Sequence, residues 1–254
     1  MRRAAQNAML GAYRVLFARG LLRSAWGRRL FFALYEFYKN LFEAGPIGAL
    51  RAFVPEGGVV IDAGANVGFF AERFARWVGP AGRVVAIEPE AANFAELARR
   101  LGAKGLGQRV DARQAVADAK SGRAHLVLNP DHPGDHRLGE AGEPVTAVRL
   151  DELVPAGRAV ALIKVDVQGA EMRVLAGASA ILTRDRPALF VEVDPAGLVR
   201  YGSSVDGLLG WLAGQGYAPH TLTRTGPRPC TRGELDGILA RRGYTDLLFL
   251  ADPL

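Results

Sequence analysis

The sequence has little of what builds disulfides and metal sites. Its 254 residues contain one cysteine, Cys230, which excludes an intrachain disulfide. The four histidines are scattered, and no group of Cys and His has the spacing of zinc ligands. A disulfide-stapled secreted fold and a zinc-stabilised domain are therefore excluded. The composition fits a reducing compartment, so we expect the protein in the cytoplasm.

Long apolar runs, repeats and low-complexity segments are also missing. No stretch reaches the ~20 apolar residues that a membrane-spanning helix needs. Arg14 and Arg19 interrupt the apolar core that a secretory signal peptide would require, and no A-x-A-like cleavage site follows it. With 49% hydrophobic residues, the chain is instead suited to one α/β domain of roughly 200 residues plus an extension.

Basic charge is concentrated near the N-terminus. Residues 1–51 contain nine Lys or Arg and two acidic residues, a net charge of +7 against +6 for the whole chain, so the rest is near −1. We expect residues 1–55 to form two or three amphipathic helices that cap the domain, with their arginines in solvent. The alternative is that residues 1–51 contact an anionic substrate or an anionic surface, such as the inner face of a membrane.

The stretch VVIDAGANVGFF, residues 59–70, joins an apolar run to a glycine-rich turn and an amphipathic segment. This order predicts a buried strand, a turn, and a helix whose N-terminus points backbone N–H groups at an anion. The dinucleotide fingerprint G-x-G-x-x-G fails, because Asn66 and Phe69 occupy its second and third glycine positions when counting starts at Gly64. A Walker phosphate loop fails as well, since no Gly-Lys-Ser/Thr follows.

Two acidic residues at strand ends indicate what this turn binds. Asp62 ends the first strand and would repel a pyrophosphate. It suits an ammonium group that lies beside a carboxylate, as in the methionine end of S-adenosylmethionine. Glu88 ends the next strand, in RVVAIEPE, and can accept hydrogen bonds from both hydroxyls of a ribose. The pair therefore favours S-adenosylmethionine over NAD.

Strands and helices alternate along the rest of the chain. We expect a closing pair of strands in APHTLT and TDLLFLAD, helices at 66–78, 90–102, 170–187 and 205–216, and strands at 58–62, 83–88, 109–117, 159–169 and 188–194. This alternation predicts a doubly wound sheet with right-handed crossovers.

An insertion at residues 119–150 interrupts the alternation, within a domain that we expect to span residues 56–254. It predicts two extra strands around a polar loop, and it leaves the sheet edge at which open α/β sheets bind ligands. His132 and His136 lie on this loop, and a neutral histidine can take a proton from a hydroxyl. We predict one of them, His136 ahead of His132, as the general base, with two solvated histidines as the alternative.

The stretch IKVDVQGAE places Lys164 and Asp166 on the same side of a strand end. Asp166 is expected beside the glycine turn, where it could accept the cofactor's ammonium, bind a metal or act as a base. Lys164 could hold Asp166 or itself act as the base, and a structural ion pair is the alternative. With Glu171 and Glu192, Asp166 could form an oxygen-rich Mg²⁺ site. We favour an anchoring role for these acids and a reaction without a metal.

These motifs together resemble the FkbM family of S-adenosylmethionine-dependent methyltransferases. The matching stretches run in order from residue 58 to residue 250: VVIDAGANVGFF, VVAIEPEAANFAEL, AVADAKSG, VTAVRLDELV, IKVDVQGAEMRVLAGA, ALFVEVD and YTDLLFL. Gln168 departs from the family, which more often has Glu there. The N-terminal extension lies outside the resemblance.

The resemblance implies a class I methyltransferase fold. This is an α/β, Rossmann-like, doubly wound sheet with a closing antiparallel strand, here preceded by the helical extension. It further implies that the glycine turn holds the methionine moiety, that Glu88 binds the ribose, and that Ala117 and Asp118 lie near the adenine. The residues expected around the cofactor are Asp62, Gly64, Ala65, Asn66, Gly68, Phe69, Glu88, Pro89, Ala117, Asp118 and Asp166.

The resemblance also implies methyl transfer to a hydroxyl, often of a sugar or secondary metabolite, so the expected partner is a small-molecule or glycan-type acceptor. A nucleic-acid N-methyltransferase is the nearest rival, because LVLNPDHP resembles the Asn/Asp-Pro-Pro-Tyr motif of those enzymes. However, Asp131 and His132 replace its second proline and its aromatic residue, and the near-neutral body lacks a nucleic-acid footprint. The remaining alternative is a non-catalytic protein that binds S-adenosylmethionine.

Overall fold

The computed structural model of the chain describes residues 27, 44–129, 136–154 and 157–252. Most of the predicted N-terminal extension therefore lies outside the described residues. Its last part forms helix α3 (Ala44–Ile47) and a 3-10 helix (Gly48–Phe53). Here Ile47 and Leu50 are buried in the core on one face of the main sheet, and the predicted cap of residues 1–55 stays a prediction. None of the described helices is long and apolar enough to cross a membrane.

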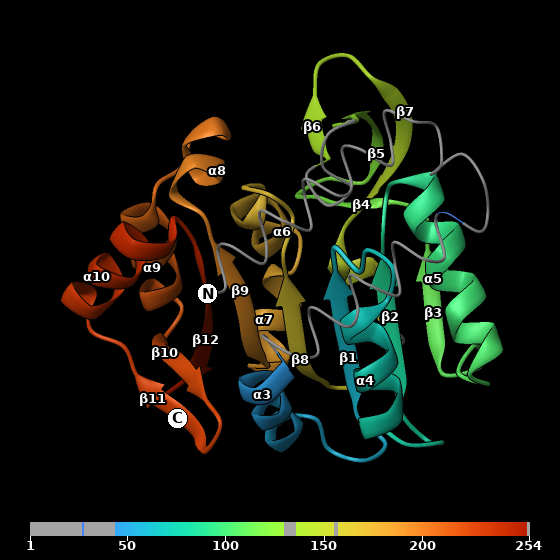
Figure 1. The fold of residues 1–254 in the computed structure, drawn as a ribbon, viewed down its shortest axis with the longest axis horizontal. Helices are drawn as coiled ribbons and strands as arrows, with labels where there is room; N and C mark the ends of the chain where they lie inside the picture. The colour runs from blue at the N-terminus through green and yellow to red at the C-terminus, as the bar shows by residue number, and fades with distance from the viewer. Residues whose placement is uncertain (1–26, 28–43, 130–135, 155–156, 253–254) are drawn as a thin grey trace.

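An eight-stranded sheet forms the centre of the described part of the chain (Figure 1). Its strands, in spatial order, are β11 (Gly226–Pro229), β10 (Tyr217–Thr223), β12 (Thr245–Ala251), β9 (Ala188–Val193), β8 (Val160–Val165), β1 (Val59–Ala63), β2 (Arg83–Ile87) and β3 (Val110–Arg113). The five strands from β9 to β3 are parallel, whereas β12 is antiparallel to both of its neighbours. The strand order reverses between β1 and β8, and open α/β sheets bind ligands at such a point.

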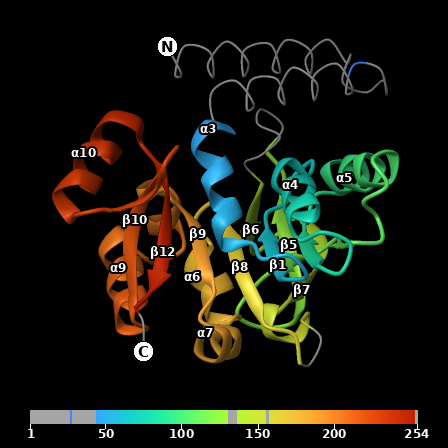
Figure 2. The ribbon, with the colours of Figure 1, turned by 90° about the horizontal axis from the view of Figure 1, so that it is seen from below.

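Helices cover both faces of this sheet (Figure 2). Helices α4 (Phe69–Trp77) and α5 (Ala91–Ala103) lie on one face with α3. On the other face lie α6 (Glu171–Ala176), α7 (Ser179–Asp185) and α9 (Val205–Gly214). Every residue of β1 is buried, as expected for a parallel strand that is covered on both sides. The predicted Rossmann-like, doubly wound sheet with a closing antiparallel strand is confirmed.

The predicted strand 109–117 is divided between two sheets. Its first part, β3, pairs with β2, whereas β4 (Val116–Ala117) pairs with β7 (Glu143–Val148) of a second sheet. This second sheet has the order β4-β7-β5-β6 and also contains β5 (Gly122–Val127) and β6 (Arg137–Gly139). The insertion thus has three strands where two were predicted, and it stands beyond the carboxyl ends of the main strands (Figure 1). We call it the inserted sheet.

The predicted helix 170–187 is likewise divided, into α6 and α7. Gly177 lies between them, and a Cβ atom there would overlap the carbonyl oxygen of Asp118. The carbonyl of Gly177 in turn accepts a hydrogen bond from the N–H of Asp151. The helix therefore breaks where it meets the two ends of the inserted sheet. The sequence prediction also lacks β11 and the helices α8 (Pro195–Arg200) and α10 (Arg232–Arg242).

Candidate active site

The turn after β1 forms as predicted and is fixed from two sides. The N–H groups of Gly64 and Ala65 both donate to the carbonyl of Ile87 at the end of β2, over 3.0 and 2.9 Å. Gly64 has φ +79°, and a Cβ atom there would overlap the carbonyl oxygen of Asp166. Only glycine allows both this conformation and this approach. The turn is therefore packed directly on the end of β8.

The rest of the turn leads into α4 through two more left-handed residues. Asn66 has φ +49°, a conformation that Asn tolerates, and its side-chain oxygen accepts the N–H of Val67 over 2.7 Å. Gly68 has φ +92° and caps α4 at its N-terminus, where a Cβ atom would lie 2.7 Å from the Leu97 side chain of α5. The turn thus sets how closely α4 and α5 approach. Phe69, also predicted at the site, is the buried first residue of α4.

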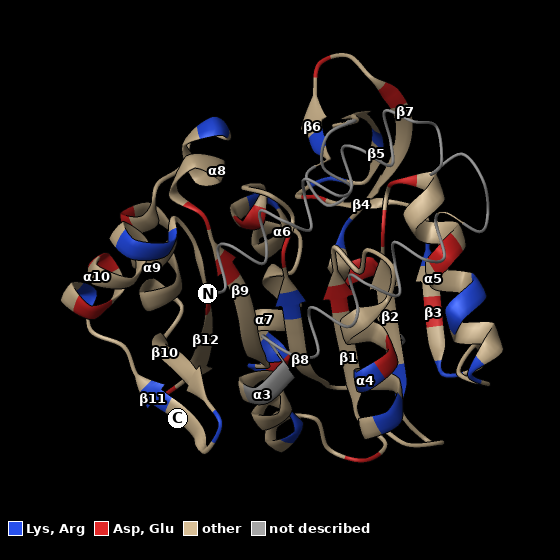
Figure 3. Cartoon of the chain, viewed as in Figure 1, with Lys and Arg blue, Asp and Glu red and all other residues tan. Residues whose placement is uncertain are grey.

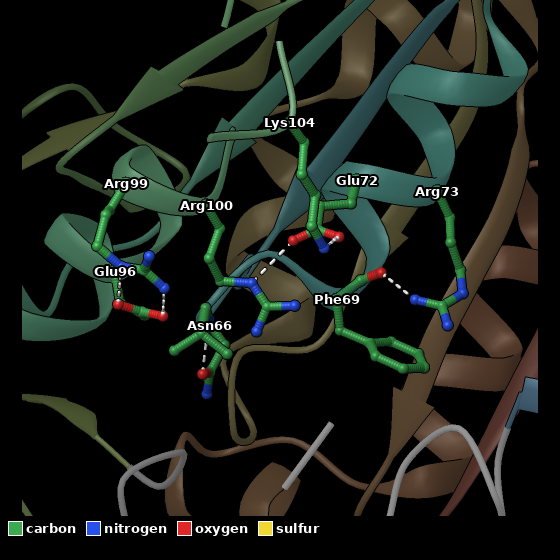
Figure 4. Close-up of polar contacts among 9 residues, drawn as sticks. Asn66, Phe69, Glu72, Arg73, Glu96, Arg99, Arg100 and Lys104 are labelled. Atoms are coloured by element: carbon green, nitrogen blue, oxygen red, sulfur yellow. Dashed lines mark hydrogen bonds and ion pairs between the residues drawn. The ribbon is translucent and has the colours of Figure 1, made fainter. Parts of the chain in front are cut away.

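Buried ion pairs join α4 to α5 behind the turn (Figure 4). Glu72 of α4 accepts hydrogen bonds from Arg100 Nε over 2.8 Å and from Lys104 Nζ over 2.5 Å. Burial raises the pKa of Glu72, but the hydrogen bonds from Lys104 and Arg100 outweigh it and leave the pKa below its ordinary value. At the start of α4, Arg73 donates to the Phe69 carbonyl over 2.7 Å and covers its ring. These contacts hold the start of α4 in place.

Glu88 lies at the end of β2, where it was predicted to bind a ribose. Its Oε2 accepts the N–H of Asn66 over 2.8 Å, and its Oε1 accepts the N–H of Glu90 over 3.0 Å. The Asn93 side chain adds a third hydrogen bond to this carboxylate, which keeps acceptor capacity for a hydroxyl donor. The side chain is buried, which raises the pKa of Glu88 to about 7, although its hydrogen bonds oppose the shift. Pro89 follows it and is half-buried.

The raised pKa of Glu88 gives a testable pH dependence. If Glu88 binds the ribose as predicted, its hydroxyl and N–H donors favour the carboxylate form, so protonation below pH 7 is expected to compete with cofactor binding. We expect the Kd for S-adenosylhomocysteine to be constant above pH 7 and to rise by up to about tenfold per pH unit below it. Calorimetry in two buffers of different ionisation enthalpy should also detect a proton released on binding near pH 7.

The variant Glu88→Gln should bind S-adenosylhomocysteine more weakly at pH 8 and should lose this pH dependence. Glu96→Gln, which alters a carboxylate on α5 paired with Arg99, is the matched control and should keep the wild-type profile. If Glu88→Gln retained both the affinity and the slope of the wild type, Glu88 would not belong to the cofactor site.

Lys164 bridges the ends of β1 and β8. Its Nζ lies 3.2 Å from Asp62 Oδ1 and 3.6 Å from Asp166 Oδ2, and it donates to the carbonyl of Gly64 over 2.7 Å. The register that pairs Asp62 with Lys164 brings them together. Both side chains are buried, and burial raises the pKa of Asp62 while the Lys164 ammonium opposes the shift. Of the roles predicted for Lys164, this geometry supports the holding of Asp166.

Asp62 therefore lies beneath the glycine turn, fully buried, and faces the ammonium of Lys164. Its effect on the glycine turn is indirect, because the ammonium of Lys164 that it pairs with also donates to the Gly64 carbonyl. The sequence prediction of a direct contact between Asp62 and the ammonium of the cofactor stays a prediction.

The turn between β8 and α6 carries the partly exposed acid of the site. The Asp166 side chain is 27% exposed, and its Oδ1 accepts from Gln168 Nε2 over 3.3 Å. The buried Glu171 stabilises this turn, because its Oε1 accepts the N–H groups of Val167 and Gly169 over 3.3 and 3.0 Å. Burial raises the pKa of Glu171 to about 7. Asp166 is thus held by Gln168 of its own turn and by Lys164 of β8.

Glu192, at the end of β9, adds another buried acid to this edge (Figure 3). Burial raises its pKa well above the ordinary value, and the charge of Asp166 adds to the shift. Across the described ranges, no three or more Asp, Glu, His or Cys side chains are arranged to hold a metal ion. The alternative Mg²⁺ set of Asp166, Glu171 and Glu192 is therefore not assembled. Oε1 of Glu171 instead accepts the backbone N–H of Gly169.

The two residues predicted near the adenine lie at the root of the inserted sheet. Ala117 is buried in β4. Asp118 is also buried, and its carboxylate accepts from Arg173 Nε over 2.8 Å and from Arg173 Nη2 over 2.5 Å. Its side chain thus links the inserted sheet to α6. A contact of either residue with adenine remains a prediction.

Of the two loop histidines, His136 lies within the described residues. His132 lies outside the described residues. His136 immediately precedes β6, and its Nδ1 accepts the N–H of Asn129 over 3.2 Å. A neutral imidazole that accepts at Nδ1 carries its proton on Nε2, so Nε2 is a donor in this arrangement. The prediction of His136 as general base stays untested, and this hydrogen bond makes Asp166 the better candidate.

Most of the predicted site residues thus meet at one edge of the sheet. The glycine turn, Glu88, Lys164 and Asp166 come together there, and the Gly64 cradle and the buried Glu88 fit a bound S-adenosylmethionine. Sequence reasoning missed Arg173, which holds Asp118, and helix α8. The start of α8 had a local signal, because Asp194 caps it and Pro195 is its first residue.

Comparisons with known proteins bear on the family and the fold of this chain. A family model described as the methyltransferase FkbM domain matches residues 62–219. No curated protein matches the sequence. Among solved structures, methyltransferase FkbM from Methylobacillus flagellatus KT is 17% identical, with a TM-score of 0.47, over 87% of this chain and 54% of the other. The chain therefore spans about half the length of that protein.

Two further solved structures are similar to this chain. A putative rRNA-methylase from Clostridium thermocellum is 13% identical, with a TM-score of 0.50, over 83% of this chain and 94% of the other. The O-methyltransferase TomG from Streptomyces achromogenes, in complex with S-adenosylmethionine, is 16% identical, with a TM-score of 0.46, over 82% and 80%. The Clostridium thermocellum structure, with its TM-score of 0.50, supports the fold alone.

The family match covers more than half of the chain, from the end of β1 to β10. It includes the glycine turn, Glu88, Lys164, Asp166 and the inserted sheet. It confirms the expected family and, with it, S-adenosylmethionine as the cofactor. The chain belongs to the family of FkbM methyltransferase domains.

Proposed function

We propose that this protein transfers the methyl group of S-adenosylmethionine to a hydroxyl of a sugar or secondary-metabolite-type acceptor. The observation that carries the proposal is the position of Asp166. Its backbone carbonyl faces Gly64 of the cofactor turn, and its partly exposed side chain is held by Lys164 and Gln168. A carboxylate in this place can accept the proton of a hydroxyl that approaches the methyl group.

When bound, S-adenosylmethionine supplies an activated methyl group, and S-adenosylhomocysteine is the product. The protein has to hold the acceptor oxygen in line with this group and to remove its proton, so positioning supplies much of the rate. The glycine turn and Glu88 fix the cofactor side. Asp166 takes the proton, and Lys164, on the far side of its carboxylate from solvent, keeps that carboxylate oriented.

The acceptor enters between the β8–α6 turn, α8 and the inserted sheet. The hydroxyl of Tyr201, just after α8, donates to the carbonyl of Leu138 in β6 over 3.1 Å. This hydrogen bond connects the two elements that follow the carboxyl ends of β9 and β3. Val127 of β5 and Val199 of α8 are exposed apolar side chains on these elements. An acceptor with both polar and apolar groups suits a surface with these side chains.

Turnover of the cofactor with a panel of acceptors tests the proposal. We expect S-adenosylhomocysteine to accumulate with at least one sugar, glycoside or polyketide-type alcohol, and mass spectrometry should place the methyl group on an oxygen. Transfer RNA and ribosomal RNA belong in the same panel. Methylation of a base nitrogen, weakened by added salt, would overturn the proposal in favour of a nucleic-acid enzyme.

A further inference from the structure

Helix α8 lies on the acceptor side of the candidate active site. It follows β9, whereas the cofactor residues come from the ends of β1 and β2 on the other side of β8. Side chains on α8 therefore have access to a bound acceptor and not to the ribose or adenine of the cofactor. The last residue of α8 is Arg200, which is exposed.

Two glycines hold α8 against the turn that carries Asp166. A Cβ atom on Gly169 would overlap the carbonyl group of Gly197, and a Cβ atom on Gly197 would lie 3.0 Å from Gly169 Cα. Gly169 also has φ +106°, which a larger residue would rarely adopt. Because the two backbones touch, α8 and the β8–α6 turn form one packed unit. A group at the end of α8 therefore has a fixed position relative to Asp166.

Arg200 and Tyr201 extend from the end of α8 in two directions. Arg200 Nη1 donates to the carbonyl of Gln168 over 3.3 Å, which places the guanidinium beside the turn that carries Asp166. Tyr201 donates to Leu138 of the inserted sheet. A basic residue in the last turn of a helix often serves only the helix dipole. Arg200 instead reaches across to the neighbouring turn, while the adjacent Tyr201 contacts the inserted sheet.

Arg200 is one of three guanidinium groups near the phenol of Tyr201. Burial raises the pKa of the Tyr201 phenol, and nearby guanidinium groups, those of Arg200, Arg173 and Arg137, oppose this shift. Arg173 is neutralised by its ion pair with Asp118. Arg200 has no carboxylate partner within the described part of the chain, and its one hydrogen bond leaves most of its five N–H donors available.

We propose that the acceptor carries an oxyanion, a phosphate or a carboxylate, and that the guanidinium of Arg200 binds it while the reacting hydroxyl faces Asp166. This inference rests on the proposed function and narrows its substrate class. A planar guanidinium can bind two oxygens of a phosphate or carboxylate at once, which fixes the orientation of the acceptor as well as its position. Tyr201 is a positioning residue, because its hydroxyl holds the end of α8 to the inserted sheet.

Binding of simple probes to the full chain, saturated with S-adenosylhomocysteine, tests this inference without a known acceptor. The probes are glucose 1-phosphate, glucuronate and glucose, and the measurement is ligand-observed NMR or calorimetry at low salt. We expect at least one charged probe to bind about tenfold or more tightly than glucose, as a charged hydrogen bond allows. A preference for glucose 1-phosphate would identify a phosphate, and a preference for glucuronate would identify a carboxylate.

Three variants assign the effect to Arg200. Arg200→Ala should bind the charged probe no better than glucose, and Arg200→Lys should recover part of the loss, because it restores the charge without the planar fork. Arg242→Ala, which removes an exposed arginine from α10, is the control and should match the wild type. Equal binding of all three probes, or an unchanged preference in Arg200→Ala, would overturn this inference alone. Failure to bind S-adenosylhomocysteine in the first place would overturn the proposed function with it.

Discussion

Gly64→Ala is expected to weaken the binding of S-adenosylhomocysteine strongly. The new Cβ atom would overlap the carbonyl oxygen of Asp166, which belongs to the backbone and cannot rotate away as a flexible side chain can. Either the glycine turn or the end of β8 must shift, and both contribute to the cofactor site. A displacement of about 1 Å in a positioned site can cost about 100-fold. Calorimetry should therefore show a Kd at least about 100-fold higher than that of the wild type.

Alanine variants of two other glycines separate the steric overlap with Asp166 from the general cost of replacing a glycine. Gly105, after α5, has φ +66° but open space around its Cβ position, so Gly105→Ala carries only the cost of a left-handed alanine, about 1–2 kcal/mol of stability. Gly102, inside α5, also has open space, and alanine there should stabilise the helix slightly. Both variants should bind the cofactor product normally. If Gly64→Ala behaved like Gly105→Ala, the contact with Asp166 would have no role in binding.

Asp166→Asn is expected to lower kcat by about 10²–10⁴ once an acceptor is known, because an amide cannot accept the proton of the hydroxyl. The substitution keeps the shape of the side chain and its hydrogen bond with Gln168 can still form. The variant should therefore stay folded. Single-turnover measurements with saturating cofactor separate this loss from any change in cofactor affinity.

The matched comparison for this prediction is His136→Ala. The Nδ1 of His136 already accepts from Asn129, so we expect this variant to lose less activity than Asp166→Asn. A larger loss in His136→Ala, with Asp166→Asn near the wild-type rate, would show that the loop histidine is the base. If Asp166→Asn were inactive and EDTA also stopped the wild type, the carboxylate would act as a metal ligand instead.

The strand, turn and helix of the glycine motif could be predicted because their signals are local. A β-branched run predicts a buried strand, and glycines at positions 64 and 68 predict a turn with positive φ angles. Glu88 could be predicted because it follows the next apolar, β-branched run, at the carboxyl end of a strand. The start signals of two unpredicted helices were local as well: Asp194 with Pro195 for α8, and the capping box of Thr231 and Glu234 for α10.

The remaining features depend on contacts between distant parts of the chain. Lys164 was placed correctly beside Asp166, but its ion pair with Asp62 follows from the register of two strands that no local pattern reveals. The division of strand 109–117 has the same origin, because Val116 finds its partner Ala147 only after the insertion has folded back. The contact between Gly169 and Gly197 holds α8 against the β8–α6 turn. It is likewise a tertiary contact, and no local sequence pattern around either glycine predicts it.

The way the inserted sheet is attached has a consequence for engineering. The chain enters it through β4 and leaves it through β7, and these two strands are paired neighbours, with Val116 beside Ala147 and Ala117 beside Val148. The segment between them thus starts and finishes at one place, and Tyr201 also donates to it at Leu138. We expect residues 122–145 to be exchangeable for those of a relative with a different acceptor, provided that the β4–β7 pair, Asp118 and the carbonyl that pairs with Tyr201 are retained. If the inserted sheet contacts the acceptor, such a chimera should change what is methylated while leaving the cofactor half of the protein intact.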